Sequence, residues 1–482
     1  MILNKEELIL AEKLVIYNNF AQINDCNGRL LEELQIYPIP RIIWDFEIMG
    51  VPNCKFPDVL HDLSQSFFTG YALKIESLKV TKNFLSGWKT SASGNAINAY
   101  WGNTEAPAHI FHFCLTNSRF QKICLEQHTL EQRVHERRFI EAPLNSVWSI
   151  KLEIGKEALQ WLDAQVGNIG IRLTGLGLLF QPIGEEVDND FPTSLTTITL
   201  IEAEKMLEKL FWLMSYAIGG FVSPIFIEGV IFPGIHTVSA QVMTDYTVTA
   251  LEQLGRSWLM EKSDLKDFIS CFSNFDKMLT QPFWMDTFHF VIVQYFQAIR
   301  GGNWKLASSA TGAALERLSH AILVEDETDP TRRAACELLY DVTQSNLART
   351  TWNLGKQAGQ ENISITGKRL RLLLERIGLT SSRGYNDMQD VQAFLDVRND
   401  AVHPKVGSMT QNQRWQLIYR GIQWIDEVLL WRLGYDGKYL DRITKAARVF
   451  SIGTTVPLLP PLTSSSLEIS PRYDLSLRDP SW

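Results

Sequence analysis

Residues 387–403 read DMQDVQAFLDVRNDAVH, and Pro404 follows them. Apolar residues recur here at the three- and four-residue spacing of one helix face: Met388, Val391, Leu395 and Val402. That spacing predicts an amphipathic helix. The same spacing would put an apolar residue at position 398, but the residue there is Arg398. An arginine on an otherwise apolar helix face is costly to bury unless it is paired or faces a groove, so we expect Arg398 to have a specific task.

A histidine lies five residues beyond this arginine, at position 403. Proline disfavours the helical conformation in the residue before it, so His403 should end the helix. A helix C-terminus stabilises the protonated form of a histidine through the macrodipole. The stretch therefore predicts a group that titrates near neutral pH beside a permanently charged cation.

The segment Arg398-Asn399-Asp400-Ala401-Val402-His403 resembles the R-x4-6-H motif of HEPN domains, which often carry asparagine after the arginine. Three flanking stretches resemble other helices of that domain: FVIVQYFQAIRGGNWKLASSATGAALERLSHAIL, GKRLRLLLERIGL and WQLIYRGIQWIDEVLLWRLGY. The resemblance covers about 283–445. With a β-rich part ahead of it, the whole chain is similar to ApeA-like antiphage proteins.

This resemblance implies a homodimer in which two motifs line one cleft, and metal-independent RNA cleavage with the ribose 2′-hydroxyl as nucleophile. His403 would exchange a proton, and Arg398 would offer a two-point fork to the charged transition state. Asn399 would orient the phosphate or His403, and Glu316 would hold Arg398 or assist proton transfer. Each residue also has a structural alternative. Arg398 would be an arginine paired for stability, and His403 a histidine that caps its helix. Asn399 would make an ordinary polar contact, and Glu316 would lie where two helices pack tightly.

A group of basic residues inside the same region is predicted to guide RNA phosphates: Lys368, Arg369, Arg371 and Arg376. The charge of the chain as a whole does not indicate a nucleic-acid footprint, because 46 basic and 54 acidic residues give a formal charge of −8. Residues 1–282 carry 23 basic and 33 acidic residues, a net of −10, whereas 283–448 carry 21 and 18, a net of +3. We therefore expect an acidic part and a mildly basic part with separate functions.

The fold class that we predict is α+β, with a β-rich, sandwich-like domain followed by an all-α HEPN-like helical bundle. Short runs of β-branched and aromatic residues separated by turn-forming clusters indicate the strands. Five parts are predicted in order. Residues 1–67 form a helical or irregular segment, and 68–244 form the β-rich sensor domain. Residues 245–282 form a helical connector that includes a helix over 245–260. Residues 283–448 form the HEPN-like domain, and 449–482 form an extended Pro/Ser-rich tail.

The uncharged stretch Leu210–Ile227 has the minimum length of a membrane span, but Gly219 and Gly220 interrupt it. We predict instead a buried helix that ends at the glycines. The six cysteines form no CxxC pair, which favours reduced thiols in a cytoplasmic protein. We expect no metal site, because no cluster with ligand spacing accompanies Arg398 and His403. We also expect no cofactor.

The sequence thus predicts an endoribonuclease of antiphage or toxin type, with RNA as substrate, a phage-derived trigger as a possible partner and no membrane association. The alternative is a non-catalytic HEPN-like module that dimerises or binds a nucleotide or a protein. A third hypothesis is that the helical domain is the target of a partner nucleotidyltransferase.

Overall fold

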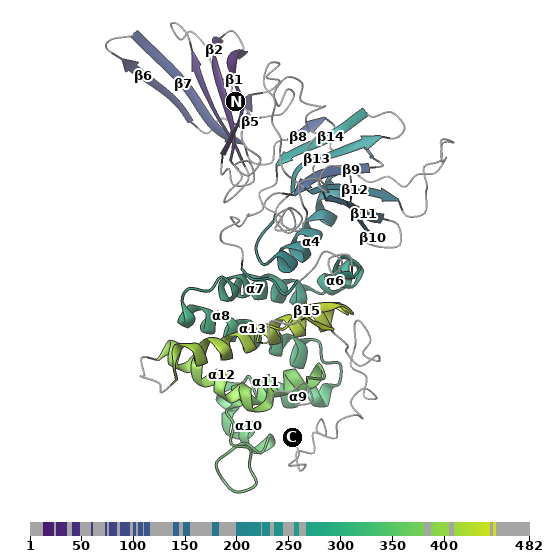
Figure 1. The fold of residues 1–482 in the computed structure, drawn as a ribbon, viewed down its shortest axis with the longest axis vertical. Coiled ribbons are helices and arrows are strands. Elements are labelled where there is room, and N and C mark those ends of the chain that lie inside the picture. Colours follow the sequence, from purple (N-terminus) through teal and green to yellow (C-terminus); the bar gives the residue numbers. More distant parts are fainter. Residues whose placement is uncertain are drawn as a thin grey trace. The chain divides into compact units, whose positions relative to one another are not determined.

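The computed structural model describes 105–108, 199–222, 255–259, 267–379, 390–403 and 409–443 with their side chains, and the remaining strands and 387–389 as backbone. The chain divides into two compact units, Met1–Leu254 and Gly255–Trp482. Figure 1 shows strands in the first unit and mostly helices in the second. The predicted tail lies almost entirely outside the described residues.

The strands of the first unit belong to three antiparallel sheets. One contains β1-β2-β3-β7-β6, a second β10-β11-β12-β9-β13-β14-β8, and a small third β4-β5. Their bounds are β1 Lys13–Ile23, β2 Cys26–Gln35, β3 Arg41–Ile48, β4 Val59–Leu60, β5 Leu73–Lys74, β6 Ser77–Asn83, β7 Gly87–Ala96, β8 Tyr100–Gly102, β9 Ile110–Leu115, β10 Arg138–Pro143, β11 Trp148–Ile154, β12 Leu176–Pro182, β13 Pro224–Ile231 and β14 His236–Met243.

The start of the chain differs from the prediction of a helical or irregular segment over 1–67. β1 reads KLVIYNNFAQI and pairs with β2 so that Ile23 lies opposite Cys26. Only Asn24 and Asp25 separate these two strands, and a two-residue link of this kind is typical of a β-hairpin. The acidic residues that suggested a helix N-terminus are outweighed by the β-branched and aromatic residues that follow.

The helix predicted across the uncharged stretch is present as α4, Leu200–Ile218. Thr199 and Glu202 form a capping box at its start, and Gly219 ends it with φ 87°, a conformation that glycine adopts without steric cost. Among the described residues, no helix is both long enough and apolar enough to cross a membrane.

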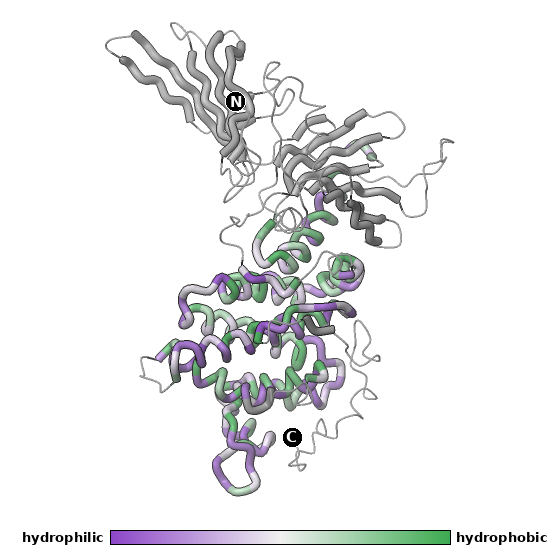
Figure 2. Tube along the Cα trace, viewed as in Figure 1, coloured by the Kyte–Doolittle hydropathy of each residue, from purple (hydrophilic) through white to green (hydrophobic). Residues whose placement is uncertain are grey.

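The second unit is helical, as predicted for the C-terminal region. Its elements are α6 Phe272–Leu279, α7 Pro282–Ile299, α8 Trp304–His320, the π-helix η3 Ala321–Glu325, α9 Pro330–Leu338, the 3-10 helix η4 Val342–Gln344, α10 Ser345–Thr351, α11 Ile365–Arg376, α12 Asp387–Val402, α13 Gln411–Leu433, and two short strands, β15 Lys438–Leu440 and β16 Ala447–Val449. Figure 2 shows hydrophobic and hydrophilic residues interspersed along these helices, the pattern of amphipathic packing.

The helix predicted over 245–260 is wrong for 255–259, which form no helix. A Cβ atom at Gly255 would lie 2.2 Å from Ile299 Cγ1, so the backbone approaches α7 too closely for a side chain. Ser257 accepts a hydrogen bond from the backbone N–H of Leu259 at 3.0 Å, a local turn that competes with helix. The rest of 245–260 lies outside the described residues.

Helix α8 is central to the second unit and packs against α7, α11, α12 and α13. A Cβ atom at Gly421 of α13 would lie 2.7 Å from Thr311 of α8 and 2.8 Å from Phe394 of α12. The glycine therefore allows three helices to meet closely at this point. This packing fixes the side of α8 that faces α12, where the candidate site lies.

Candidate functional site

The last turn of α12 presents the predicted motif. Helix α12 ends at Val402, and the backbone N–H of His403 donates to the carbonyl of Asn399 at 2.8 Å. The prediction that His403 ends the helix is therefore confirmed. The side chains of Asn399 and His403 are exposed, while Arg398 is partly buried against α8. None of the described residues forms a hydrogen bond with the imidazole of His403 or the amide of Asn399.

Arg398 is paired with the predicted glutamate, 82 residues away in the chain. Its Nη2 donates to Glu316 Oε1 at 2.9 Å, and the two side chains are 31% and 33% exposed. A charge-assisted bond of this length orients the guanidinium without removing it from solvent. The contact agrees with the predicted role of Glu316 in holding Arg398, and its other predicted role, in proton transfer, stays a prediction.

A glycine provides the space for this arginine on α8. A Cβ atom at Gly312 would lie 3.0 Å from Arg398 Cγ and 3.4 Å from its Nε. Gly312 and Glu316 are four residues apart and therefore on the same face of α8. The arginine thus crosses over a bare stretch of backbone and reaches the carboxylate one turn further on. The sequence indicated that Gly312 allows close helix packing, and the structure shows that Arg398 occupies that space.

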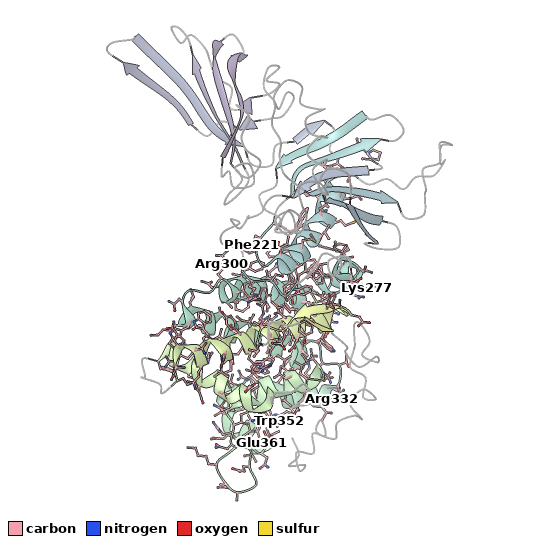
Figure 3. The ribbon with its side chains drawn as sticks, viewed as in Figure 1. Phe221, Lys277, Arg300, Arg332, Trp352 and Glu361 are labelled. Atoms are coloured by element: carbon pink, nitrogen blue, oxygen red, sulfur yellow. The ribbon has the colours of Figure 1, made fainter. Side chains whose placement is uncertain are left out.

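The four basic residues predicted to contact RNA lie on α11, Ile365–Arg376. Lys368 is 1% exposed, pairs with Glu361 at 3.1 Å, and lies over the ring of Trp352 at 5.6 Å from its centre. Both Glu361 and Trp352 are labelled in Figure 3, near α10. Burial lowers the pKa of Lys368, and the nearby Glu361 carboxylate opposes this effect.

The other members of the group are also held internally. Arg376 is buried and donates to Glu327 Oε2 at 3.0 Å. Arg369 donates to the carbonyl of Leu339 at 2.8 Å and stacks on Tyr340. Buried, paired side chains do not reach the phosphates of RNA bound at the surface. The RNA-contact prediction is therefore wrong for the buried Lys368 and Arg376, and it stays a prediction for the partly buried Arg369 and Arg371.

Two cysteines are described, and neither has the character of a reactive thiol. Burial raises the pKa values of Cys271 and Cys336 to about 12, so both are protonated at neutral pH. Within the described part of the chain, no three His, Cys, Asp or Glu side chains are grouped so that they could hold a metal ion.

Sequence reasoning missed a second group of polar residues at the end of α8. Arg317, His320 and Glu325 lie together there, with Arg317 Nη1 2.6 Å from Glu325 Oε2. His320 Nδ1 is 3.3 Å from Arg317 Nη1 and 3.4 Å from Glu325 Oε2. The segment ALERLSH contains Glu316 and two of these three residues, but nothing in its spacing indicates the π-helix that brings Glu325 back to them.

Comparison with known proteins gives one match. A family model described as the YopA C-terminal domain matches residues 281–452, slightly more than a third of the chain. The match begins at the start of α7 and ends just after β16, so it covers the Arg398–Glu316 pair and His403. No curated protein and no solved structure matches the chain.

Proposed function

We propose that the chain is a metal-independent endoribonuclease, in which a HEPN-like helical domain cleaves RNA at the Arg398 and His403 motif. The observation that carries the proposal is the Arg398–Glu316 pair. It holds a guanidinium at the surface, at the end of α12, where the imidazole of His403 is exposed. An oriented cation and an accessible histidine, five residues apart at the end of one helix, are the two kinds of group that cleavage by the ribose 2′-hydroxyl needs.

The chemistry assigns a separate role to each side chain. Attack of the 2′-oxygen on phosphorus concentrates negative charge on the phosphoryl oxygens, and a planar guanidinium can donate two parallel hydrogen bonds to them. His403 takes the proton of the 2′-hydroxyl. Asn399, exposed beside Arg398, would orient the phosphate, and Glu316 would prevent the guanidinium from rotating away.

A homodimer would bring two copies of the motif to one cleft. A two-fold interface uses the same patch on both subunits, so a site near the axis is duplicated. Val402 precedes His403 and is 59% exposed, an apolar side chain next to the motif that a second subunit could cover. We propose that the sandwich-like first unit acts as a sensor. Its acidic charge would repel RNA until a phage-derived trigger is bound.

One observation favours the non-catalytic alternative. Two of the four α11 cations, Lys368 and Arg376, are buried, so the described surface of the helical unit offers fewer phosphate contacts than the sequence suggested. A paired Arg398 is also compatible with a domain that only dimerises or binds a nucleotide or a protein. The two proposals predict different results for a variant without His403. An enzyme would lose RNA cleavage, whereas a binding module would be unaffected in this respect.

The test uses the full chain and one short, end-labelled, single-stranded RNA, in EDTA, from pH 5 to 9. His403→Ala should lower the cleavage rate about 10²–10⁴-fold because it removes acid–base catalysis, while RNA binding is retained. Arg398→Lys keeps the charge but loses the planar fork, so it should also cleave slowly. Arg300→Lys, at the exposed end of α7, is the matched control and should behave as the wild type.

The products should carry 2′,3′-cyclic phosphate ends. A His403→Ala variant that cleaves at the wild-type rate with a flat pH profile would remove the catalytic role and favour the binding module. Cleavage that stops in EDTA and returns with magnesium would indicate a different active site. The test can be repeated in cells infected by phage, where a trigger would be present. RNA integrity is then measured for the wild type and both variants.

A further inference from the structure

The end of α12 that carries His403 lies against the start of α8, and Arg414 of α13 joins the two helices. The Nη2 atom of Arg414 is 3.9 Å from Asp400 Oδ2, in the last turn of α12. Its guanidinium also lies over the ring of Trp304, the first residue of α8, 4.6 Å from the ring centre. The Arg414 side chain is only 16% exposed, so it occupies the space between these two helix ends.

A second contact shows that α8 and α12 run in opposite directions. A Cβ atom at Gly421 of α13 would lie 2.7 Å from Thr311 of α8 and 2.8 Å from Phe394 of α12. From the first contact to the second, α8 advances from 304 to 311 and α13 from 414 to 421, whereas α12 goes back from 400 to 394. Figure 1 shows the three helices as neighbours. The first turn of α8 is therefore the part of this helix nearest to the His403 end of α12.

Lys305, in the first turn of α8, is on the side of this helix that faces α12. The helix begins here because Asn303 accepts a hydrogen bond from the backbone N–H of Lys305 at 3.0 Å. Residues seven apart in an α-helix are rotated by only about 20° from each other. Gly312 is seven residues after Lys305, and Arg398 of α12 crosses over this glycine. Lys305 and Gly312 therefore lie on the same side of α8, two turns apart.

The ammonium group of Lys305 is accessible to a ligand. The residue is exposed, and its Nζ lies 5.8 Å from the centre of the Trp304 ring, on which Arg414 also stacks. Among the described residues, no carboxylate forms an ion pair with Lys305. Lys368 of α11 differs in this respect, because its ammonium is buried and bound to Glu361. Lys305 therefore supplies a surface cation at the end of α12 that carries the motif.

We propose that Lys305 binds a phosphate of the RNA strand that neighbours the phosphate being cleaved. The proposal rests on the proposed ribonuclease function. Glu316, which holds the guanidinium of Arg398, is eleven residues after Lys305, about 16 Å along the helix axis. The two cations would therefore contact different phosphates of one strand. A lysine ammonium is a compact charge on a flexible stem, so this contact would position the RNA backbone without reading the base sequence.

The first test compares two substrates with the full-length chain. A dinucleoside monophosphate contains only the phosphate that is cleaved, whereas a single-stranded RNA of ten nucleotides also contains its neighbours. Lys305→Gln should raise the KM for the longer RNA by roughly fivefold, the loss of about one net hydrogen bond, and should leave kcat unchanged. The same variant should cleave the dinucleoside monophosphate as the wild type does, because that substrate has no second phosphate to lose.

The second test measures binding without cleavage, in full-length His403→Ala protein. The affinity for the fluorescently labelled ten-nucleotide RNA is followed by anisotropy as the salt concentration is raised. Each phosphate contact with a single strand adds about 0.7 to the slope of log affinity against log salt concentration. Adding Lys305→Gln should therefore lower this slope by about 0.7. Adding Lys305→Arg keeps the charge and should retain the slope.

Arg300→Gln is the control, with the same change of charge at the same end of the helical unit. Arg300 is exposed at the end of α7, which contacts a different side of α8: Arg317 of α8 donates to the carbonyl of Phe283 of α7 at 3.2 Å. Arg317 is five residues after Gly312 and is therefore rotated by about 140° from it. Arg300→Gln should leave both KM and the salt slope at their wild-type values.

The outcomes separate the phosphate contact from the ribonuclease function. RNA binding that depends on Lys305 as described, with no cleavage by the wild type, would contradict the ribonuclease function and support the contact. Cleavage by the wild type, with the same KM and salt slope in Lys305→Gln, would overturn the contact and leave the function intact. An equal loss in Arg300→Gln, or an equal loss on the dinucleoside monophosphate, would also overturn it, because the effect would then not come from a neighbouring phosphate at Lys305.

Discussion

Helices α11 and α12 both carry basic residues that the sequence assigned to RNA, yet they place them in opposite environments. Lys368 of α11 is 1% exposed and Arg376 is paired with the buried Glu327. Arg398 of α12 is 31% exposed and paired with an equally accessible glutamate. The number of cations in a segment is therefore a poor guide to its surface. The environment of a cation depends on which carboxylates and rings the fold brings to it.

The two kinds of ion pair should contribute very differently to stability. Removing one partner of a buried pair leaves an uncompensated charge in the interior. Removing one partner of an accessible pair leaves a charge that water can solvate. Substitutions in the two helices can therefore test whether α11 holds structural cations and α12 a functional one.

The largest effect on stability should come from Arg376→Ala. We expect the free energy of unfolding to fall by up to about 3 kcal/mol, the lower end for a broken buried pair, because Glu327 keeps Arg332, 3.3 Å away, as a partner. Arg398→Ala should cost only about 0–1 kcal/mol. Urea unfolding followed by tryptophan fluorescence measures both. The control Arg300→Ala, at an exposed helix end, should stay within about 0.5 kcal/mol of wild type. Equal losses for Arg376→Ala and Arg398→Ala would contradict the distinction between the two helices.

A smaller effect should follow from Gly312→Ala on α8. The added Cβ atom would lie 3.0 Å from Arg398 Cγ, so the arginine must shift by a few tenths of an ångström. Alanine favours helix by up to about 1 kcal/mol, which offsets the crowding, and net stability should change little. Cleavage should nevertheless fall by about tenfold, since small misplacements of a catalytic group are costly.

The neighbouring Ser309→Ala, on the same helix, is the control for this change and should leave the cleavage rate unaltered. If Gly312→Ala cleaves as fast as wild type while Arg398→Ala does not, the position of the guanidinium on α8 is unimportant. In that case Gly312 serves only to pack the two helices.

How much of this could be predicted from sequence depended on the range of the interaction. The end of α12 at His403 was predictable, because the proline rule acts between adjacent residues. The pairing of Glu316 with Arg398 was predicted only through the family resemblance, because the two residues are 82 positions apart. The inward turn of Lys368 was not predictable. It depends on Glu361 and Trp352, which reach α11 from a separate loop and helix.

Two further regions, the start of the chain and the end of α8, differ from what the local sequence suggests. A helical or irregular segment was predicted over 1–67, but β1 and β2 form a hairpin there. Helix α8 ends at His320, and the chain continues as the π-helix η3, which the sequence analysis did not predict. Residues 321–324 of η3 are apolar and buried like those of an ordinary last helical turn, so the spacing of apolar residues in the sequence does not distinguish a π-turn from an α-turn. The group at Arg317, His320 and Glu325 was therefore visible only in three dimensions.

The smallest effect concerns His289 of α7, which is half-buried, whereas His403 is exposed. Burial lowers the pKa of His289, and the nearby Asp286 opposes this only in part. The unfolded chain then binds a proton at about pH 6.5, the ordinary value for histidine, before the folded chain does. The stabilising contribution is therefore complete above about pH 6.5 and is lost as the pH falls below that value. His289→Gln should flatten the fall in unfolding free energy between pH 7.5 and 5.5, measured by urea unfolding, whereas the exposed control Arg300→Ala should leave the slope unchanged. A slope that is the same in His289→Gln and in the wild type would mean that another group carries this pH dependence.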